Sequence, residues 1–232
     1  MMQVMSTRRR CYSRLCRLGF VALAGLAGHA SAQIETPSWR GSEGSTWQEW
    51  HFLTNSNPAG PEFYSNSIGL ASASVSTGGF ASGWVWDLFS FGTATGYWDL
   101  GQSGSIDLSI PDYGGPTLTG LKDVRVQVVQ WIEGSFYSLY AGVSIPEATL
   151  ISRTNRLYEQ TGFGAWRVDD WHFQIPDETP SDLVAILGAT GGTIIDLIVI
   201  DTLTIPEPSA LLVCAAACGI GLLARRRMRP RG

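Results

Sequence analysis

The sequence predicts an all-β protein: an antiparallel β-sandwich, jelly-roll-like, preceded by a signal peptide and followed by a single C-terminal transmembrane helix. Short segments rich in β-branched and aromatic residues run through the centre of the chain, and turn residues separate them. No window of a dozen central residues shows the 3.6-residue apolar period of a helix. Short strands without helices are typical of sandwiches, and the lack of an internal repeat disfavours propellers and β-helices.

Residues 1–32 have the pattern of a secretory signal peptide. Five arginines precede the apolar run 18–28, which is too short to span a bilayer stably. Small residues follow at Ala30 and Ala32, in the A-x-A pattern that a signal peptidase requires. We therefore expect export and cleavage after Ala32, with an uncleaved N-terminal membrane anchor as the alternative.

The central segment, residues 33–204, is predicted to form one domain of nine strands. Turn segments rich in Gly, Pro, Asn, Asp or Ser separate these strands, at 55–61, 78–79, 113–116, 134–135, 177–180 and 188–192. The predicted strands are Trp47–Phe52, Gly83–Phe91, Ser105–Ile110, Val124–Ile132, Phe136–Ile145, Thr149–Arg156, Ala165–Ile175, Leu183–Leu187 and Thr193–Thr204.

Alternation within these strands predicts which of them are central. Val124, Val126 and Val128 alternate with polar residues, the pattern of a strand with one buried face. The segment 194–200 is apolar on both faces apart from Asp196, which is typical of a strand in the middle of a sheet.

Charge and cysteine content exclude several classes of function for the domain. Residues 33–205 carry six basic and nineteen acidic side chains, a net charge of −13, which disfavours binding to nucleic acid. All four cysteines lie outside this segment, so the domain has no disulfide, thiolate zinc site or cysteine nucleophile. No catalytic motif is present, and Lys122 is the only lysine. We expect a protein that is not an enzyme.

The carboxylates and histidines of the domain predict no cofactor and no metal site. Asp170 and His172 fall on one face of a strand, which supplies half a metal site at best, and a solvated strand face is the alternative. Calcium is the one ion left open, because Asp169–Asp170 and Asp177–Asp182 carry oxygen ligands, although no calcium-loop motif is present. A glycosidase would need two paired acids, which the sequence does not locate.

Nine tryptophans are the most unusual feature of the domain. Large aromatic side chains commonly fill the space between two sheets, and this interpretation suffices for most of them. A glycan platform is the functional alternative, because sugar C–H faces stack on indole rings while neighbouring polar groups bond the hydroxyls. The candidate stacking residues are Trp84, Trp86 and Trp171.

The C-terminal segment predicts a membrane anchor. Residues 210–224 contain no charged side chain, and Arg225, Arg226 and Arg227 follow directly. As a helix these residues would extend about 22 Å, so the bilayer must thin locally or the arginines must snorkel. The arginines would stay cytoplasmic and hold the domain outside. A buried soluble helix is disfavoured because the segment has no polar face.

Pro206, Glu207 and Pro208 stand immediately before this apolar segment. Pro-Glu-Pro, an apolar helix and an arginine cluster, in this order, resemble the PEP-CTERM sorting signal, with Ile205 in place of the usual Val. The resemblance covers residues 205–232. It implies export in a Gram-negative bacterium that makes extracellular polysaccharide, and recognition by a membrane-embedded exosortase that cuts near the motif.

The central domain is also loosely similar to ectodomains that precede such tails, at 47–50, 57–62 and 195–202, but that likeness carries no activity. The expected partners are the exosortase, the secretion machinery, the inner membrane and extracellular polysaccharide. The expected location is an inner-membrane-anchored precursor, then the cell surface or extracellular matrix. We expect a structural or adhesive protein with glycan binding, and a secreted carbohydrate-active hydrolase is the alternative.

Overall fold

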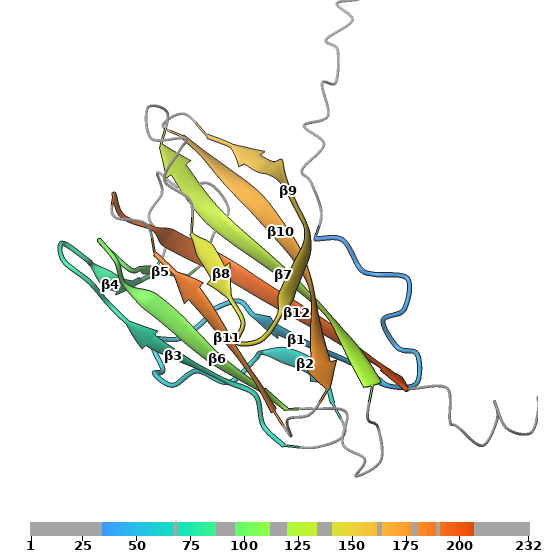
Figure 1. The fold of residues 1–232 in the computed structure, drawn as a ribbon. Helices are drawn as coiled ribbons and strands as arrows, with labels where there is room; N and C mark the ends of the chain where they lie inside the picture. Colours follow the sequence, from blue (N-terminus) through green and yellow to red (C-terminus); the bar gives the residue numbers. More distant parts are fainter. Residues whose placement is uncertain are drawn as a thin grey trace, which may run out of the picture. The chain divides into compact units, whose positions relative to one another are not determined.

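The computed structural model describes residues 34–66, 69–86, 96–111, 120–133, 141–161, 164–177, 181–188 and 191–206 (Figure 1). Every regular element in these ranges is a β-strand, which confirms the prediction of an all-β domain. Within them no helix is long and apolar enough to cross a membrane. The predicted signal peptide and the chain beyond Pro206 lie outside the described residues.

The strands form two antiparallel sheets (Figure 1). The larger sheet has the order β2 (Phe63–Ser65), β1 (Ser45–Trp50), β12 (Ile194–Pro206), β7 (Gly120–Glu133), β10 (Gly164–Asp177) and β9 (Thr149–Gln160), and β5 (Tyr97–Asp99) and β4 (Gly83–Val85) extend it beside the start of β12. The smaller sheet has the order β3 (Ser72–Ser76), β6 (Ser105–Pro111), β11 (Ser181–Leu187) and β8 (Gly142–Ser144). β12 lies between β1 and β7, so the prediction of a central strand is confirmed.

The main core lies between the two sheets. Alternate residues of β7 face it, namely Val124, Val126 and Val128, as the sequence pattern predicts. The smaller sheet contributes Ile106 and Leu108, which belong to the same buried cluster. Burial of these apolar side chains is the main force that holds the sheets together, at roughly 25 cal/mol for each Å² removed from water.

A second apolar cluster covers part of the opposite, outer face of the larger sheet. Its buried members are Tyr97, Val129, Trp166, Val168, Leu197 and Val199. β12 contributes to both clusters because successive residues of a strand face opposite sides, and its register with β7 shifts between Ile195 in the inner core and Leu197 in the outer cluster. This irregularity accommodates Asp196 between residues that face the inner core and residues that face the outer cluster.

Three strands were not predicted: β2, β3 and β5. Two have only three residues, and β3 alternates serine with the small buried residues Ala73 and Val75, so its period-2 signal is weak. Of the predicted strands 83–91 and 136–145, the structure describes residues 83–86 and 141–145, which include β4 and β8. β12 also extends beyond the predicted end of the domain, since Ile205 and Pro206 still pair with β7.

Candidate functional site

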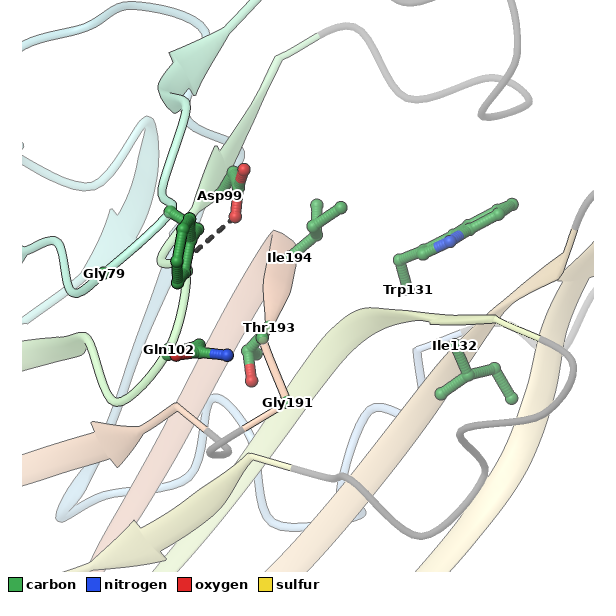
Figure 2. A pocket seen from close by; sticks show the side chains of 11 residues that line it. Gly79, Asp99, Gln102, Trp131, Ile132, Gly191, Thr193 and Ile194 are labelled. Atoms are coloured by element: carbon green, nitrogen blue, oxygen red, sulfur yellow. Dashed lines mark hydrogen bonds between the residues drawn. The ribbon is translucent and has the colours of Figure 1, made fainter.

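A cleft of about 320 Å³ opens where the end of β7 lies near the start of β12 (Figure 2). Turn residues from three parts of the chain complete its rim. Among the described residues, the lining comprises Trp131 and Ile132 of β7, Thr193 and Ile194 around the start of β12, Asp99 of β5, and the turn residues Gly79, Phe80, Gly101, Gln102, Gly191 and Gly192.

The indole ring of Trp131 is held in place by its neighbours. It lies edge-to-face with Trp166, with 5.4 Å between ring centroids and 70° between planes, and Trp166 packs in turn on Tyr97 at 6.1 Å. Trp166 is only 1% exposed. A Cβ atom on Gly164 would come within 2.6 Å of the Trp131 ring, so glycine is required there. The ring is therefore oriented before any ligand arrives.

Phe80 supplies a second aromatic ring to the cleft and is 92% exposed. Its backbone φ of 61° is in the left-handed region, which is uncommon for an aromatic residue. The turn around Phe80 is tied to its neighbour by two backbone bonds, from the Gly78 N–H to the Leu100 carbonyl and from the Gln102 N–H to the Gly79 carbonyl, each 2.8 Å long. An outward-pointing aromatic ring on an anchored turn is a feature expected of a binding surface.

Asp99 is the only charged side chain among the described residues that line the cleft. Its carboxylate accepts hydrogen bonds from the backbone N–H groups of Ser82 and Gly101, each 2.9 Å long, and so holds both turns in place. Figure 2 shows Asp99 at the edge of the cleft. Gln102 contributes an exposed neutral amide. The cleft thus combines aromatic surface, a neutral hydrogen-bonding group and a net negative charge.

The three predicted stacking residues lie in two different places. Trp84 and Trp86 lie together, with ring centroids 5.9 Å apart and a 41° angle between planes. The Trp84 Nε1–H donates to the Phe52 carbonyl at 2.8 Å, whereas Trp86 is 58% exposed. Trp171 is only 3% exposed in the core between the sheets, with the Arg153 guanidinium 4.9 Å from its ring centroid. The prediction of Trp171 as a stacking residue is therefore wrong.

Of the aspartates considered for calcium, Asp169, Asp170 and Asp182 have described side chains, and these three do not converge. Asp169 pairs with Arg167 and Arg153, whereas Asp170, on the opposite face of β10, pairs with other arginines. Asp182 is bonded to Lys122 instead. Within the described ranges, no group of three or more His, Cys, Asp or Glu side chains is arranged to hold a metal ion.

One buried carboxyl group has a strongly altered protonation. Burial raises the pKa of Asp196 to about 7; the positive charge of His51 opposes the rise, and the negative charge of Glu159 adds to it. The carboxylate of Glu49, 3.5 Å from the His51 Nε2 atom, raises the pKa of His51, and burial lowers it by less. Asp196 therefore holds a proton near neutral pH, which the sequence did not predict.

Trp131 and Phe80 were not predicted as site residues, although the sequence holds part of the signal. Phe80 directly follows the predicted turn at 78–79, and the predicted turn at 188–192 forms another part of the rim. The cleft itself could not be predicted from local patterns, because its residues lie about 110 positions apart in the sequence.

No protein-family model matches the chain, and no curated protein matches it in sequence.

Proposed function

We propose that the chain is an exported protein of the cell surface or extracellular matrix whose β-sandwich binds glycans and has a structural or adhesive role without catalysis. The observation that carries the proposal is the Trp131 ring, fixed in orientation beside an open cleft. Pyranose rings present C–H faces that pack on aromatic rings, and their hydroxyls bond neutral polar groups such as Gln102. A preoriented ring loses little conformational entropy on binding.

The charge of the cleft favours an uncharged glycan. Asp99 gives the described lining a negative charge, and the segment 33–205 carries a net charge of −13. Carboxylated, sulfated or phosphorylated polysaccharides would be repelled by both. A neutral polymer is not repelled in this way, so its binding should depend little on ionic strength.

The strand order supports jelly-roll winding, the finer fold that we propose. From β6 to β8 and from β10 to β12, successive strands alternate between the two sheets. The resulting orders β1–β12–β7–β10 and β6–β11–β8 interleave early and late strands, as two Greek keys do.

Export and sorting are supported by the sequence features at the two ends of the chain. The last described strand, β12, ends at Pro206, the first residue of the Pro-Glu-Pro motif. Processing at this point would leave the paired strands intact. The proposed route is signal-peptidase cleavage, anchoring in the inner membrane, and exosortase processing that delivers the domain to the surface or matrix.

Affinity electrophoresis tests the binding proposal directly. The purified protein is run in native gels that contain neutral, anionic or cationic polysaccharides. We expect retardation by a neutral polysaccharide, and its loss in the Trp131→Ala variant. Phe63→Ala, which removes another exposed aromatic ring on β2, is the matched control and should be retarded like the unchanged protein. Unchanged mobility across the whole series would exclude glycan binding.

A carbohydrate-active hydrolase is the second candidate, and one observation favours it. General acid catalysis needs a carboxylic acid that keeps its proton near neutral pH, and Asp196 meets this requirement. The test is release of reducing ends from the polysaccharide that retards the protein. Release that is abolished by Asp196→Asn would support hydrolysis, and no release by the unchanged protein would reject it.

A further inference from the structure

We propose that the domain has a second carbohydrate-binding site, formed between residues 34–44, which we call the N-terminal strap, and the outer face of the larger sheet. This inference rests on the proposed glycan binding and extends it, because two sites on one domain would cross-link polysaccharide chains. The second site is a cleft of about 350 Å³. Its lining is distinct from that of the first cleft, which we call the Trp131 cleft.

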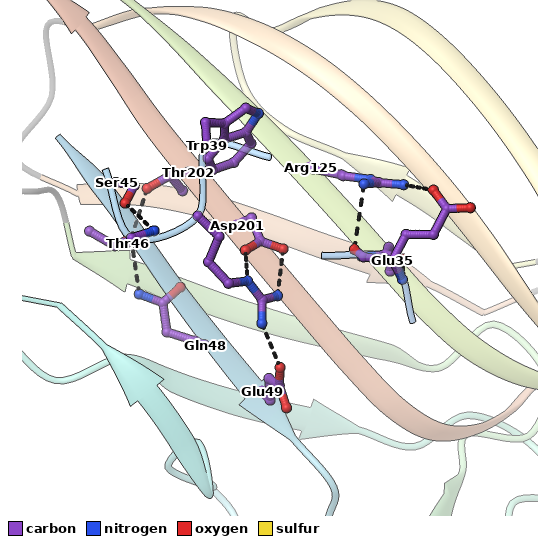
Figure 3. Close-up of polar contacts among 12 residues, drawn as sticks. Glu35, Trp39, Ser45, Thr46, Gln48, Glu49, Arg125, Asp201 and Thr202 are labelled. Atoms are coloured by element: carbon purple, nitrogen blue, oxygen red, sulfur yellow. Dashed lines mark hydrogen bonds and ion pairs between the residues drawn. The ribbon is translucent and has the colours of Figure 1, made fainter. Parts of the chain in front are cut away.

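The strap is fixed to the sheet at several points (Figure 3). The Arg40 guanidinium donates to both carboxylate oxygens of Asp201, at 2.5 and 2.8 Å, and to Glu49 at 3.0 Å. The backbone N–H of Glu35 donates to the Gln127 side chain at 2.9 Å, and the Glu35 carbonyl accepts from it at 2.8 Å. These bonds hold the strap in place, so it forms a fixed wall of the cleft.

The two walls of this cleft have complementary chemistry. The strap contributes Pro37 and the half-buried ring of Trp39. The sheet contributes Ser152, Thr154 and His172, and the β9–β10 register places Ser152 beside His172. A ring-shaped polyhydroxyl ligand can pack on the indole and bond the hydroxyl and imidazole groups.

The charged groups of the cleft neutralise one another. The Arg125 guanidinium donates to Asp170 at 2.9 and 2.5 Å and to Glu35 at 2.6 Å. Arg156 contacts the same two carboxylates, at 3.1 Å from Asp170 and 3.8 Å from Glu35. Because both carboxylates of the cleft are paired with arginines, an uncharged glycan is favoured again.

The two clefts are too far apart for one short oligosaccharide. Arg125 lines the second cleft and Trp131 the first, and six strand residues place them roughly 20 Å apart along β7. A short oligosaccharide would fill each site separately. Long polymers would join different copies of the domain, so a dilute polysaccharide solution should form a network when the protein is added.

Calorimetric titration with disaccharides, which are too short to reach from one cleft to the other, tests the inference. The probe is prepared by partial hydrolysis of the neutral polysaccharide that retards the protein most. We expect two molecules bound per chain, one in Trp39→Ala, one in Trp131→Ala and none in the double variant. The unchanged protein should also raise the turbidity and viscosity of the intact polysaccharide, whereas each single variant should bind it without forming a network.

Loss of Trp39 could loosen the strap, so a second variant keeps the test decisive. Ser152→Ala combined with Thr154→Val removes two exposed hydroxyls on β9 and should weaken the second site about tenfold. Ser144→Ala, an exposed hydroxyl on β8, is the matched control and should change neither site.

The outcomes separate this inference from the proposed function. One disaccharide per chain, abolished by Trp131→Ala and unaffected by both strap-cleft variants, would overturn the second site and leave glycan binding in place. One disaccharide that depends only on Trp39 would overturn the role of the Trp131 cleft, and with it cross-linking. No binding of any neutral saccharide would overturn both.

Discussion

At the scale of single residues, the ion pair between Lys122 and Asp182 lies buried in the core. Lys122 is fully buried on the inner side of β7, and its Nζ lies 2.8 Å from an oxygen of Asp182 on β11. The pair therefore joins the two sheets through the apolar layer. Taking both charges out of water offsets most of their attraction, but loss of one partner leaves a buried charge without its counter-ion.

The first prediction concerns this pair. Asp182→Ala should lower the free energy of unfolding by about 1–3 kcal/mol, because the Lys122 ammonium loses the carboxylate that lies 2.8 Å from its Nζ. The double variant Lys122→Met/Asp182→Leu replaces the pair by apolar side chains and should recover most of that loss. Urea denaturation of the three proteins measures the difference. An equal loss in the single and double variants would contradict this account.

The second prediction concerns the pH dependence of stability. The pKa of Asp196 is about 7 in the folded protein and near 3.8 when unfolded, so the folded state holds this proton over a range where the unfolded state has released it. The contribution of Asp196 to stability is complete below about pH 4 and is lost as pH rises towards 7. His51 acts in the same direction, because its pKa is also raised. Asp196→Asn should make the decline of stability with rising pH less steep.

Thermal unfolding between pH 4 and 8 checks this expectation. At pH 8, Asp196→Asn should be more stable than the unchanged protein by an amount on the order of 1 kcal/mol, since partial exposure reduces the cost of the charge. Asp107→Asn, an exposed carboxyl on β6, is the matched control and should leave the pH profile unchanged. A decline as steep in Asp196→Asn as in the unchanged protein would contradict the assignment.

At the scale of elements, the N-terminal strap is held by buried charge. The Asp201 side chain is fully buried, and Arg40 contacts both of its oxygens. Arg40→Ala should lower stability by about 2–4 kcal/mol and accelerate amide exchange in residues 34–44. Hydrogen exchange read by mass spectrometry measures this. Arg153→Ala, whose side chain is 40% exposed, is the control and should leave exchange in the strap unchanged.

The elements also show which parts of the fold the sequence could predict. The period of two in β7 and the apolar residues on both faces of β12 were sufficient to predict these two strands, because alternation and burial are local signals. β10 was ambiguous, since aspartates occupy both of its faces, and the Asp169 carboxylate is fully buried against Arg167. Periodicity placed Trp171 on the same face as Asp169 but did not show that this face is the inner one.

The candidate sites depend on contacts that no local pattern contains. Trp131 was assigned to a strand, but its role depends on Gly164 and Trp166 from β10 and on turns distant in the chain. The strap preceded the first predicted strand, and only its long-range pairing with Asp201 makes it a wall. The strand segments could thus be predicted from the sequence, whereas the two clefts could not.

At the scale of the whole molecule, the charges are separated along the chain. Ten of the sixteen basic side chains lie in the two terminal segments, and the acidic domain lies between them. A domain of this charge would repel anionic polymers, while the basic ends would remain at the cytoplasmic side of the membrane. An acidic domain between two such ends is consistent with the proposed role outside the cell.

The last prediction concerns the proposed processing of the tail. β12 ends at Pro206, so Pro206→Ala/Pro208→Ala changes the motif at and beyond the end of the last described strand. The variant should fold with an unchanged melting temperature. In the native host it should accumulate as unprocessed precursor in the membrane fraction, because the residues recognised by the exosortase are altered.

Immunoblotting of membrane and extracellular fractions, with the mass of the released C-terminus, measures processing of the tail variant. Pro146→Ala/Pro176→Ala is the matched control, because it removes two exposed prolines elsewhere on the domain and should be processed normally. Normal release of the Pro206→Ala/Pro208→Ala protein would exclude the sorting signal while leaving the glycan-binding proposal intact, since the two clefts include no residue of the tail.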